Sequence, residues 1–182
     1  MVELFKRPHI DFIAWRWVDV VIANEEDCSE VLGIRAGSRE LFMGELEVNH
    51  YAEVARQVVA QFPHLSMVAI TLRESYSASH NNWGAMLYVA RDDQAYFAPQ
   101  VEEQYQPYEI RNIVDRVGAG DAFAGALIFA LTTPELSEPP AALRFATAAS
   151  CLAHSIEGDF NYALRPEIEA LMQGATSGRV AR

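Results

Sequence analysis

The stretch Asp115-Arg116-Val117-Gly118-Ala119-Gly120-Asp121 leads directly into Ala122 to Leu131, a run that is apolar all round and rich in small residues. Such a run predicts a buried, closely packed helix. The two glycines before it let the backbone turn tightly, and the unpaired N–H groups at the start of the helix would then form an anion site that the helix dipole reinforces. The stretch therefore predicts a turn and helix start that bind an anion.

Asp121 stands beside that predicted anion site, where a carboxylate is unfavourable unless it takes part in chemistry. If the anion is a transferring phosphoryl group, Asp121 can accept the proton of an attacking hydroxyl. The amides of Gly118, Ala119 and Gly120 would then hold the developing charge. These residues alone fit equally well a plain tight turn. Two other phosphate signatures are missing: there is no Gly-x-x-x-x-Gly-Lys-Ser/Thr run, and Gly-x-Gly-x-x-Gly would need glycine where Phe123 stands.

The composition is that of one acidic globular domain. The chain has 182 residues, 51% of them hydrophobic, and 14 Lys and Arg against 25 Asp and Glu give a net charge of −11. A chain of this length can bury a sizeable core. The acidic excess argues against nucleic acid as a partner, because nucleic-acid binders gather Lys and Arg against phosphates.

Cysteine usage and the apolar runs predict the cellular setting. Cys28 and Cys151 stand alone in the sequence, so neither a disulfide framework nor a Cys-rich metal site is expected, and a reducing, cytoplasmic setting is favoured. Met1 to Trp17 lacks the order of a signal peptide, and Ala122 to Pro134 is too short to span a bilayer. We therefore expect neither secretion nor a membrane partner.

Strand-like and helix-like segments alternate along the chain. Strands are predicted at Trp17 to Ala23 and Met67 to Leu72, each next to a helical pattern, which indicates a parallel α/β sheet. Asn82-Trp83-Gly84 is interpreted as a turn, and Ala85 to Ala90 with Gln94 to Ala98 as a hairpin. Helices are predicted after the N-cap Asn24, at Tyr51 to Phe62, at Ala141 to Ala153 and at Pro166 to Met172.

The run from Asp115 to Gly125 resembles the second signature of the ribokinase-like (PfkB) carbohydrate kinases, in particular their 2-keto-3-deoxygluconate kinase branch. Further segments resemble the family in the same order along residues ~17 to 182. They are Asn24-Glu25-Glu26-Asp27, Ile70-Thr71-Leu72-Arg73-Glu74, Gly158-Asp159-Phe160-Asn161 and Ser177-Gly178-Arg179-Val180. Several ordered motifs make a coincidence improbable.

The resemblance implies roles for individual residues. Asp121 would be the catalytic base, and Gly118, Ala119 and Gly120 the anion hole. Asn24 and Asp27 would lie near Mg²⁺ and its waters beside the ATP phosphates, although the same pair also fits a simple helix cap.

Further residues are implied on the nucleotide side. Thr71 and Arg73 would face the phosphates, with Thr71 fitting equally well as an ordinary strand residue. Ala148, Cys151, Leu152 and Asn161 would border adenine, although such an Ala-rich face more often belongs to a core. Asp115 is expected to orient the loop or, as in some relatives, to bind a monovalent cation. Arg116 stands where many relatives have Thr, and either contacts phosphate or is solvated.

The implied fold is a three-layer α/β arrangement with a doubly wound, mostly parallel sheet. The family's N-terminal strands and lid are not recognisable, so residues 1–16 are interpreted as an atypical segment, 17–175 as the nucleotide-binding C-terminal part, and 176–182 as a tail. A sheet cut in this way would expose strand edges and apolar surface. We therefore expect a homo-oligomer or a missing N-terminal half.

The implied activity is that of a kinase which transfers the γ-phosphate of Mg·ATP to a primary hydroxyl of a keto-deoxy sugar acid. The substrate would be 2-keto-3-deoxygluconate and the product its 6-phosphate. Two alternatives stay open: a truncated, non-catalytic nucleotide-binding or oligomerisation module, and a PfkB kinase for another sugar such as fructose or ribose. A kinase without a closing lid would be slow or hydrolytic at best.

Overall fold

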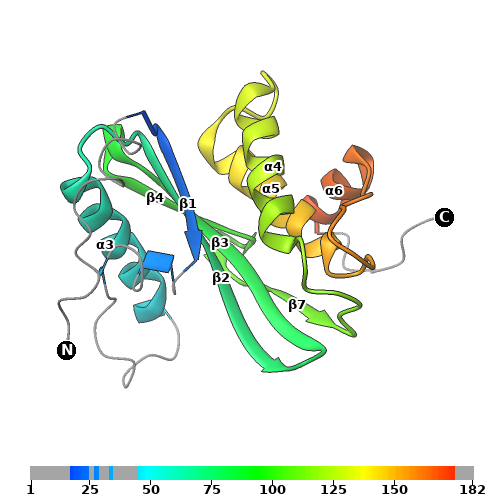
Figure 1. Cartoon of the computed structure of the whole chain (residues 1–182). Coiled ribbons are helices and arrows are strands. Elements are labelled where there is room, and N and C mark those ends of the chain that lie inside the picture. Colours follow the sequence, from blue (N-terminus) through cyan, green and yellow to red (C-terminus); the bar gives the residue numbers. More distant parts are fainter. Residues whose placement is uncertain (1–16, 25–26, 29–32, 35–44, 175–182) are drawn as a thin grey trace. The chain divides into compact units, whose positions relative to one another are not determined.

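The computed structural model describes residues 17–24, 27–28, 33–34 and 45–174. They form two compact units: residues up to 69 together with 88–94, and residues 70–87 together with those from 95 onward. The helices and strands are β1 (Val20–Asn24), α3 (Glu45–Gln61), β2 (Met67–Ser77), β3 (His80–Val89), β4 (Gln94–Ala98), β5 (Gln100–Val101), β6 (Gln104–Tyr105), β7 (Tyr108–Arg111), α4 (Ala119–Thr132), α5 (Pro139–Ala153) and α6 (Arg165–Met172) (Figure 1).

The main sheet has five strands in the order β1-β2-β3-β4, with β7 paired to β3. The expectation of a mostly parallel sheet is wrong for this part of the chain, because the sheet is mostly antiparallel. Only two residues connect β2 to β3, and a 3-10 turn at Ala90–Asp92 connects β3 to β4. A parallel pair would need a crossover of a dozen residues or more. The three-layer, doubly wound arrangement stays a prediction.

The turn expected at Asn82-Trp83-Gly84 is also wrong, because these residues lie inside β3. The hairpin expected between β3 and β4 is confirmed, and Asp93 closes its turn in the left-handed conformation, with φ of 49°. β7 runs antiparallel to β3, with Asn81 opposite Ile110 and Trp83 opposite Tyr108. Asn81 and Trp83 therefore point to one face of β3, and Asn82 to the other.

The first unit contains β1 and α3. The helix predicted at Tyr51 to Phe62 is confirmed and begins earlier, at Glu45. Ala55 and Val58 are fully buried on it, while Arg56 forms an ion pair of 2.8 Å with Asp93. Of the helix expected after Asn24, the described residues are 27 and 28, which are helical.

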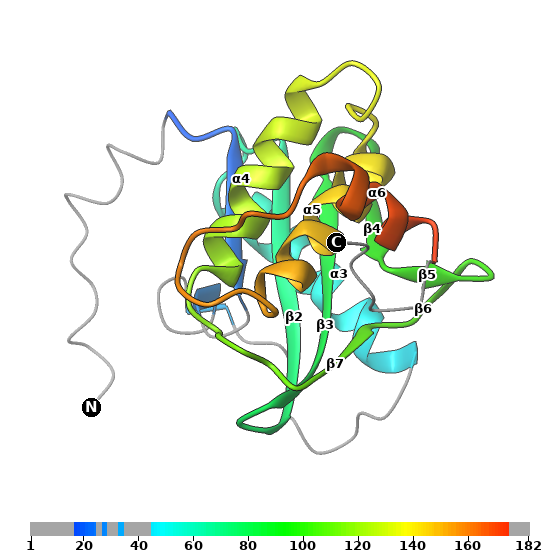
Figure 2. The same ribbon diagram turned by 90° about the vertical axis from the view of Figure 1, so that its right-hand side faces the viewer.

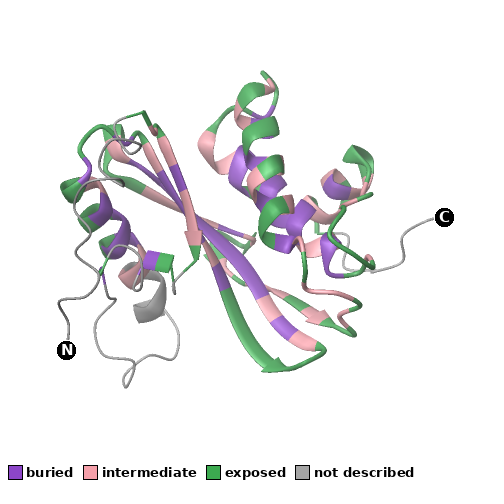
Figure 3. Cartoon of the chain, in the orientation of Figure 1, coloured by how far each residue is buried: buried purple, intermediate pink, exposed green. Residues whose placement is uncertain are grey.

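The second unit contains α4, α5 and α6, which lie near one another in Figure 2. All three helices were predicted, although α4 begins slightly earlier than expected. One stripe along α4 is buried (Figure 3), and it includes Ala119, Phe123 and Leu127. The prediction of a buried α4 is confirmed for this stripe and wrong for the rest of the helix, since Ile128 is 60% exposed and Phe129 45% exposed. Among the described residues, no helix combines the length and apolar character needed to cross a membrane.

Candidate active site

Gly118 forms the turn that starts α4. It has φ of 79°, and its carbonyl accepts the first helical hydrogen bond from the Ala122 amide at 2.8 Å. A Cβ on Gly118 would overlap the backbone of Asp159, so both the conformation and the close approach require glycine. Gly120 has open space around its Cα and an ordinary φ, so neither reason applies to it.

The first turn of α4 combines amides that have no acceptor within the helix with an exposed carboxylate. N–H groups at a helix start have no acceptor within the helix, and the helix dipole makes this end positive. Ala119 is buried against Trp83 and Ala153, which anchors the turn in the core. Gly120 and Asp121 are exposed. An anion could therefore reach these amides from solvent, next to the Asp121 carboxylate.

Asp115 holds the loop before α4 in place. Its Oδ1 accepts hydrogen bonds from the amides of Arg116 at 2.7 Å and Val117 at 3.0 Å, and its Oδ2 accepts one from Gly158 at 3.0 Å. These backbone hydrogen bonds, from Val117 first, hold the pKa of Asp115 below its usual range. The carboxylate thus joins the loop before α4 to the loop after α5, while cation binding at Asp115 stays a prediction.

Arg116 is neither simply solvated nor free. Its guanidinium donates to the Asn81 Oδ1 at 2.9 Å and to the Ser77 carbonyl. Asn81 is fully buried, and sequence reasoning missed it. The Arg116 Nε is buried without a hydrogen-bond partner. The loop before α4 is therefore fastened to the hairpin of β2 and β3.

A cavity of 480 Å³ in the second unit is lined by residues of α4, of α5, and of the segment from the loop after α5 into α6. It presents Asp121 at the start of α4 and the ring of Phe129 further along the same helix. The other lining residues are Ala122, Gly125, Ala126, Phe145, Ala149, Asp159, Phe160, Asn161, Ala163, Arg165 and Ile168. The cavity thus has polar groups near the Asp121 carboxylate and an aromatic wall at Phe129, a combination that suits a ligand with both kinds of group.

The residues expected around adenine are only partly brought to this cavity. Asn161 lines it, with Nδ2 donating to the Ala149 carbonyl and Oδ1 accepting from the Ala163 amide, both at 2.9 Å. Ala148 is fully buried in α5, and its neighbour Ala149 lines the cavity. Cys151 packs against the cluster around Trp83 instead, and burial raises the pKa of its thiol to about 12. A contact of these residues with adenine stays a prediction.

Thr71 and Arg73 lie on β2 in the second unit, on the face opposite the buried Leu72. Arg73 is exposed. Burial lowers the pKa of His154, and the charges of Arg116 and Arg73 add to this effect. A contact of Thr71 and Arg73 with phosphates stays a prediction.

Asn24 and Asp27 belong to the first unit. The Asn24 amide donates to the Asp27 Oδ2 at 3.0 Å, and the Asp27 amide donates to the Asn24 Oδ1 at 2.8 Å. This reciprocal pair has the geometry of the helix cap that the sequence also allowed. Among the described residues, no group of three or more His, Cys, Asp or Glu could hold a metal directly. One carboxylate and one amide fit Mg²⁺ that keeps its waters and is shared with phosphates.

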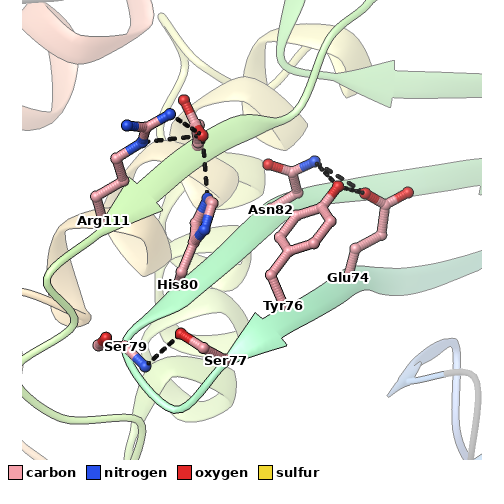
Figure 4. Close-up of polar contacts among 8 residues, drawn as sticks. Glu74, Tyr76, Ser77, Ser79, His80, Asn82 and Arg111 are labelled. Atoms are coloured by element: carbon pink, nitrogen blue, oxygen red, sulfur yellow. Dashed lines mark hydrogen bonds and ion pairs between the residues drawn. The ribbon is translucent and has the colours of Figure 1, made fainter.

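Sequence reasoning also missed a polar face on β2, β3 and β7 (Figure 4). Asn82 Nδ2 donates to Glu74 at 2.8 Å and to the Tyr76 hydroxyl at 2.9 Å. Glu109 on β7 accepts hydrogen bonds from Arg111 and lies 3.0 Å from His80, and these contacts, Arg111 first, lower its pKa. The acidic groups of this face are thus partnered within it, which indicates a structural role.

The loop and helix start occur in a known family. The pattern of the pfkB family of carbohydrate kinases matches residues 76–161, which include the Asp115–Asp121 loop, α4 and α5. Among curated proteins, none matches the chain significantly.

Solved structures agree with this match. The crystal structure of 2-dehydro-3-deoxygluconokinase from Thermotoga maritima is 40% identical, has a TM-score of 0.75, and covers 91% of this chain and 45% of that chain. A PfkB family carbohydrate kinase from Listeria grayi is 26% identical, has a TM-score of 0.65, and covers 86% of this chain and 41% of its own. A protein from Enterococcus faecalis, assigned provisionally as a 2-keto-3-deoxygluconate kinase, shares the fold at 24% identity, with a TM-score of 0.64 and coverage of 90% and 43%.

The chain thus spans less than half the length of each of these relatives, with a ribokinase-like fold matched over that part. Its second unit contains the turn, the helix start and the cavity described above. With the matched pattern and the 40% identity, these features show that the chain belongs to the pfkB family of carbohydrate kinases.

Proposed function

We propose that the chain carries the phosphoryl-transfer site of a kinase for a keto-deoxy sugar acid, 2-keto-3-deoxygluconate, and that the product is the 6-phosphate. The observation that carries the proposal is the start of α4. There Gly118 packs closely against the backbone of Asp159, and Asp121 is exposed and lines the cavity. The choice of sugar is supported by the 40% identity to the Thermotoga maritima 2-dehydro-3-deoxygluconokinase.

In this proposal Asp121 accepts the proton of the sugar's primary hydroxyl. The hydroxyl oxygen forms a bond to the γ-phosphorus, the bond from that phosphorus to the bridging oxygen breaks, and ADP leaves with the electron pair. The first-turn amides of Gly118, Ala119 and Gly120 donate to the oxygens of the transferred group, where charge develops. Asp115 holds these amides in position through its three backbone hydrogen bonds.

Kinases of this family use ATP and Mg²⁺. Bound Mg²⁺ would neutralise charge on the β- and γ-phosphates. Asn24 and Asp27 would hold its waters, and Thr71 and Arg73 would face the phosphates, with Arg73 adding positive charge. Asn161 would border the nucleotide through the cavity wall that it shares with Ala149.

The test is ADP release by the full chain with Mg·ATP, with and without 2-keto-3-deoxygluconate. We expect sugar-dependent release, and a drop of about 10²- to 10⁴-fold in Asp121→Asn, because the general base is lost. Glu102→Gln removes the same charge from an exposed residue between β5 and β6 and serves as the matched control. Sugar-dependent release that survives in Asp121→Asn would contradict the assigned role.

A second candidate is a nucleotide-binding module without transfer, which is favoured by the coverage of only 45% of the Thermotoga maritima structure. The same variants separate the two. A binding module would bind ATP without sugar-dependent ADP release, and Asp121→Asn would bind ATP equally well or better, since a negative charge beside the phosphates is removed.

A further inference from the structure

Arg116 links two segments that are far apart in the sequence. It belongs to the loop that ends in the first turn of α4, and its guanidinium donates to the Ser77 carbonyl and to the Asn81 Oδ1 at 2.9 Å. Ser77 ends β2, and Asn81 is a fully buried residue of β3. A planar guanidinium with two such acceptors allows little freedom to the loop that carries it.

Both acceptors of Arg116 are neutral. Among the residues that the structure describes, Arg116 makes no ion pair, and its buried Nε has no hydrogen-bond partner. The nearby Asp115 carboxylate is occupied by three backbone amides. The positive charge of Arg116 is therefore not cancelled by a bound carboxylate.

The surroundings of Arg116 keep this charge effective. His154 is buried, its Nδ1 lies 2.9 Å from the Ser150 carbonyl, and burial together with the Arg116 charge lowers its pKa. Arg116 is only two residues before Gly118, the N-cap of α4, and the first turn of this helix is the positive end of its dipole. The charge of Arg116 and the helix dipole are therefore two sources of positive potential carried by the same loop and helix start.

We propose that Arg116 is a positioning residue: clamped to Ser77 and Asn81, it fixes the loop so that the first amides of α4 face a phosphate, and its uncompensated charge strengthens phosphate binding there. This inference rests on the phosphate-binding loop of the proposed function and goes beyond it. It assigns to Arg116 and Asn81 a role that neither the glycines nor Asp121 perform.

The experiment follows the backbone amide resonances of Gly118 and Gly120 while the full chain, labelled with ¹⁵N, is titrated with inorganic phosphate. We expect Arg116→Gln, which keeps a donor and loses the charge, to bind phosphate about tenfold more weakly at low salt. A unit charge at roughly 10 Å in a half-buried setting has an effect of this size. Arg116→Lys should recover part of the affinity, and the difference from Arg116→Gln should shrink as salt is added.

The matched control is Arg111→Gln, which removes a guanidinium already paired with Glu109 on β7. We expect no change in its phosphate affinity. If Arg116→Gln does not fold, Asn81→Asp is used instead. This variant keeps the oxygen that accepts from Arg116 but places a carboxylate beside the guanidinium and neutralises its charge. We therefore expect the same loss of phosphate affinity. Unchanged phosphate affinity in these variants, or an equal loss in Arg111→Gln, would overturn the proposal.

The phosphate titration tests the clamp of Arg116, and the ADP-release assay tests the kinase activity, so the two proposals can be contradicted separately. Phosphate binding that depends on Arg116 without any sugar-dependent ADP release would support the clamp and overturn the kinase activity of the chain. Sugar-dependent ADP release with phosphate affinity independent of Arg116 would overturn the clamp and leave the kinase. An unmodified chain that binds no phosphate would overturn the clamp, and the kinase would still be decided by ADP release.

Discussion

At the scale of single residues, the two glycines of the turn carry different constraints. Gly118 needs its left-handed φ of 79° and lies against the Asp159 backbone. Gly118→Ala should therefore lower the free energy of unfolding by at least ~1–2 kcal/mol, the cost of a left-handed L-residue, with the overlap adding to it. Urea unfolding measures this change.

Gly120→Ala is the control, because it meets open space at a helical position. Alanine favours helix over glycine, so this variant should gain ~0.5–1 kcal/mol. Equal losses in both variants would contradict the assignment of the constraint to Gly118 alone.

The local part of the site could be predicted from the sequence, because a turn and a helix start are encoded within a few neighbouring residues. The glycines, Asp121 and α4 itself lie in one short stretch. The clamp of Arg116 on Asn81 could not be predicted in this way, because the two residues are 35 positions apart and meet only through the sheet. The expectation that Arg116 is simply solvated is wrong for the same reason, while a contact of Arg116 with phosphate stays a prediction.

At the scale of elements, β3 shows how a sequence pattern can mislead. Polar residues and glycine at Asn82-Trp83-Gly84 are typical of a turn. In the structure Gly84 lies inside the strand, where a Cβ would meet the ring of Tyr105 on β6. The glycine makes room for an aromatic side chain, and this reason depends on tertiary contacts. The hairpin of β3 and β4 and the helices α5 and α6 depend on local signals, and their prediction is confirmed.

We expect the stability of the protein to depend on pH through a histidine at the C-terminal end of α5. His154 follows this helix, is buried, and packs edge-to-face on Trp83 with ring centres 4.7 Å apart. Burial lowers its pKa in the folded protein. The unfolded chain therefore binds the proton more readily than the folded protein. The contribution of neutral His154 to the free energy of unfolding is complete above the ordinary histidine pKa and is lost as the pH falls below that value.

The loss should reach at most about 1.4 kcal/mol for each pH unit, the limit for one proton. Urea unfolding at pH 7.5 and 5.5 measures it, with His154→Gln as the comparison. The difference in unfolding free energy between the two pH values should be smaller in the variant. An equal difference in both proteins would show that other groups titrate instead.

At the scale of the whole molecule, the candidate site depends on tertiary contacts within the second unit. The loop before α4 is tied to β2 and β3 by Arg116, and to the loop after α5 by Asp115. Gly118 backs onto Asp159 in that same loop. The first turn of α4 is thus held from two sides, which is the preorganisation that the proposed stabilisation of a transition-state charge would require.

Exposed apolar residues of α4, which form its outer side, lead us to expect that copies of the chain associate with one another. Ile128 is 60% exposed and Phe129 45% exposed, and Phe129 also lines the cavity together with Phe160, which is 69% exposed. Burying one such side chain stabilises a complex by roughly 1.5–3 kcal/mol. We therefore expect sedimentation equilibrium to give a mass above the 20.3 kDa of one chain at micromolar concentrations.

Ile128→Lys should raise the dissociation constant at least about tenfold, because a charge would have to be buried in the contact. Ser79→Lys adds the same charge in the exposed turn between β2 and β3 and should leave the association unchanged. A mass of one chain at every concentration would show that the outer side of α4 does not drive association between copies. An equal effect of the two lysines would show that net charge, rather than the apolar side of α4, governs the association.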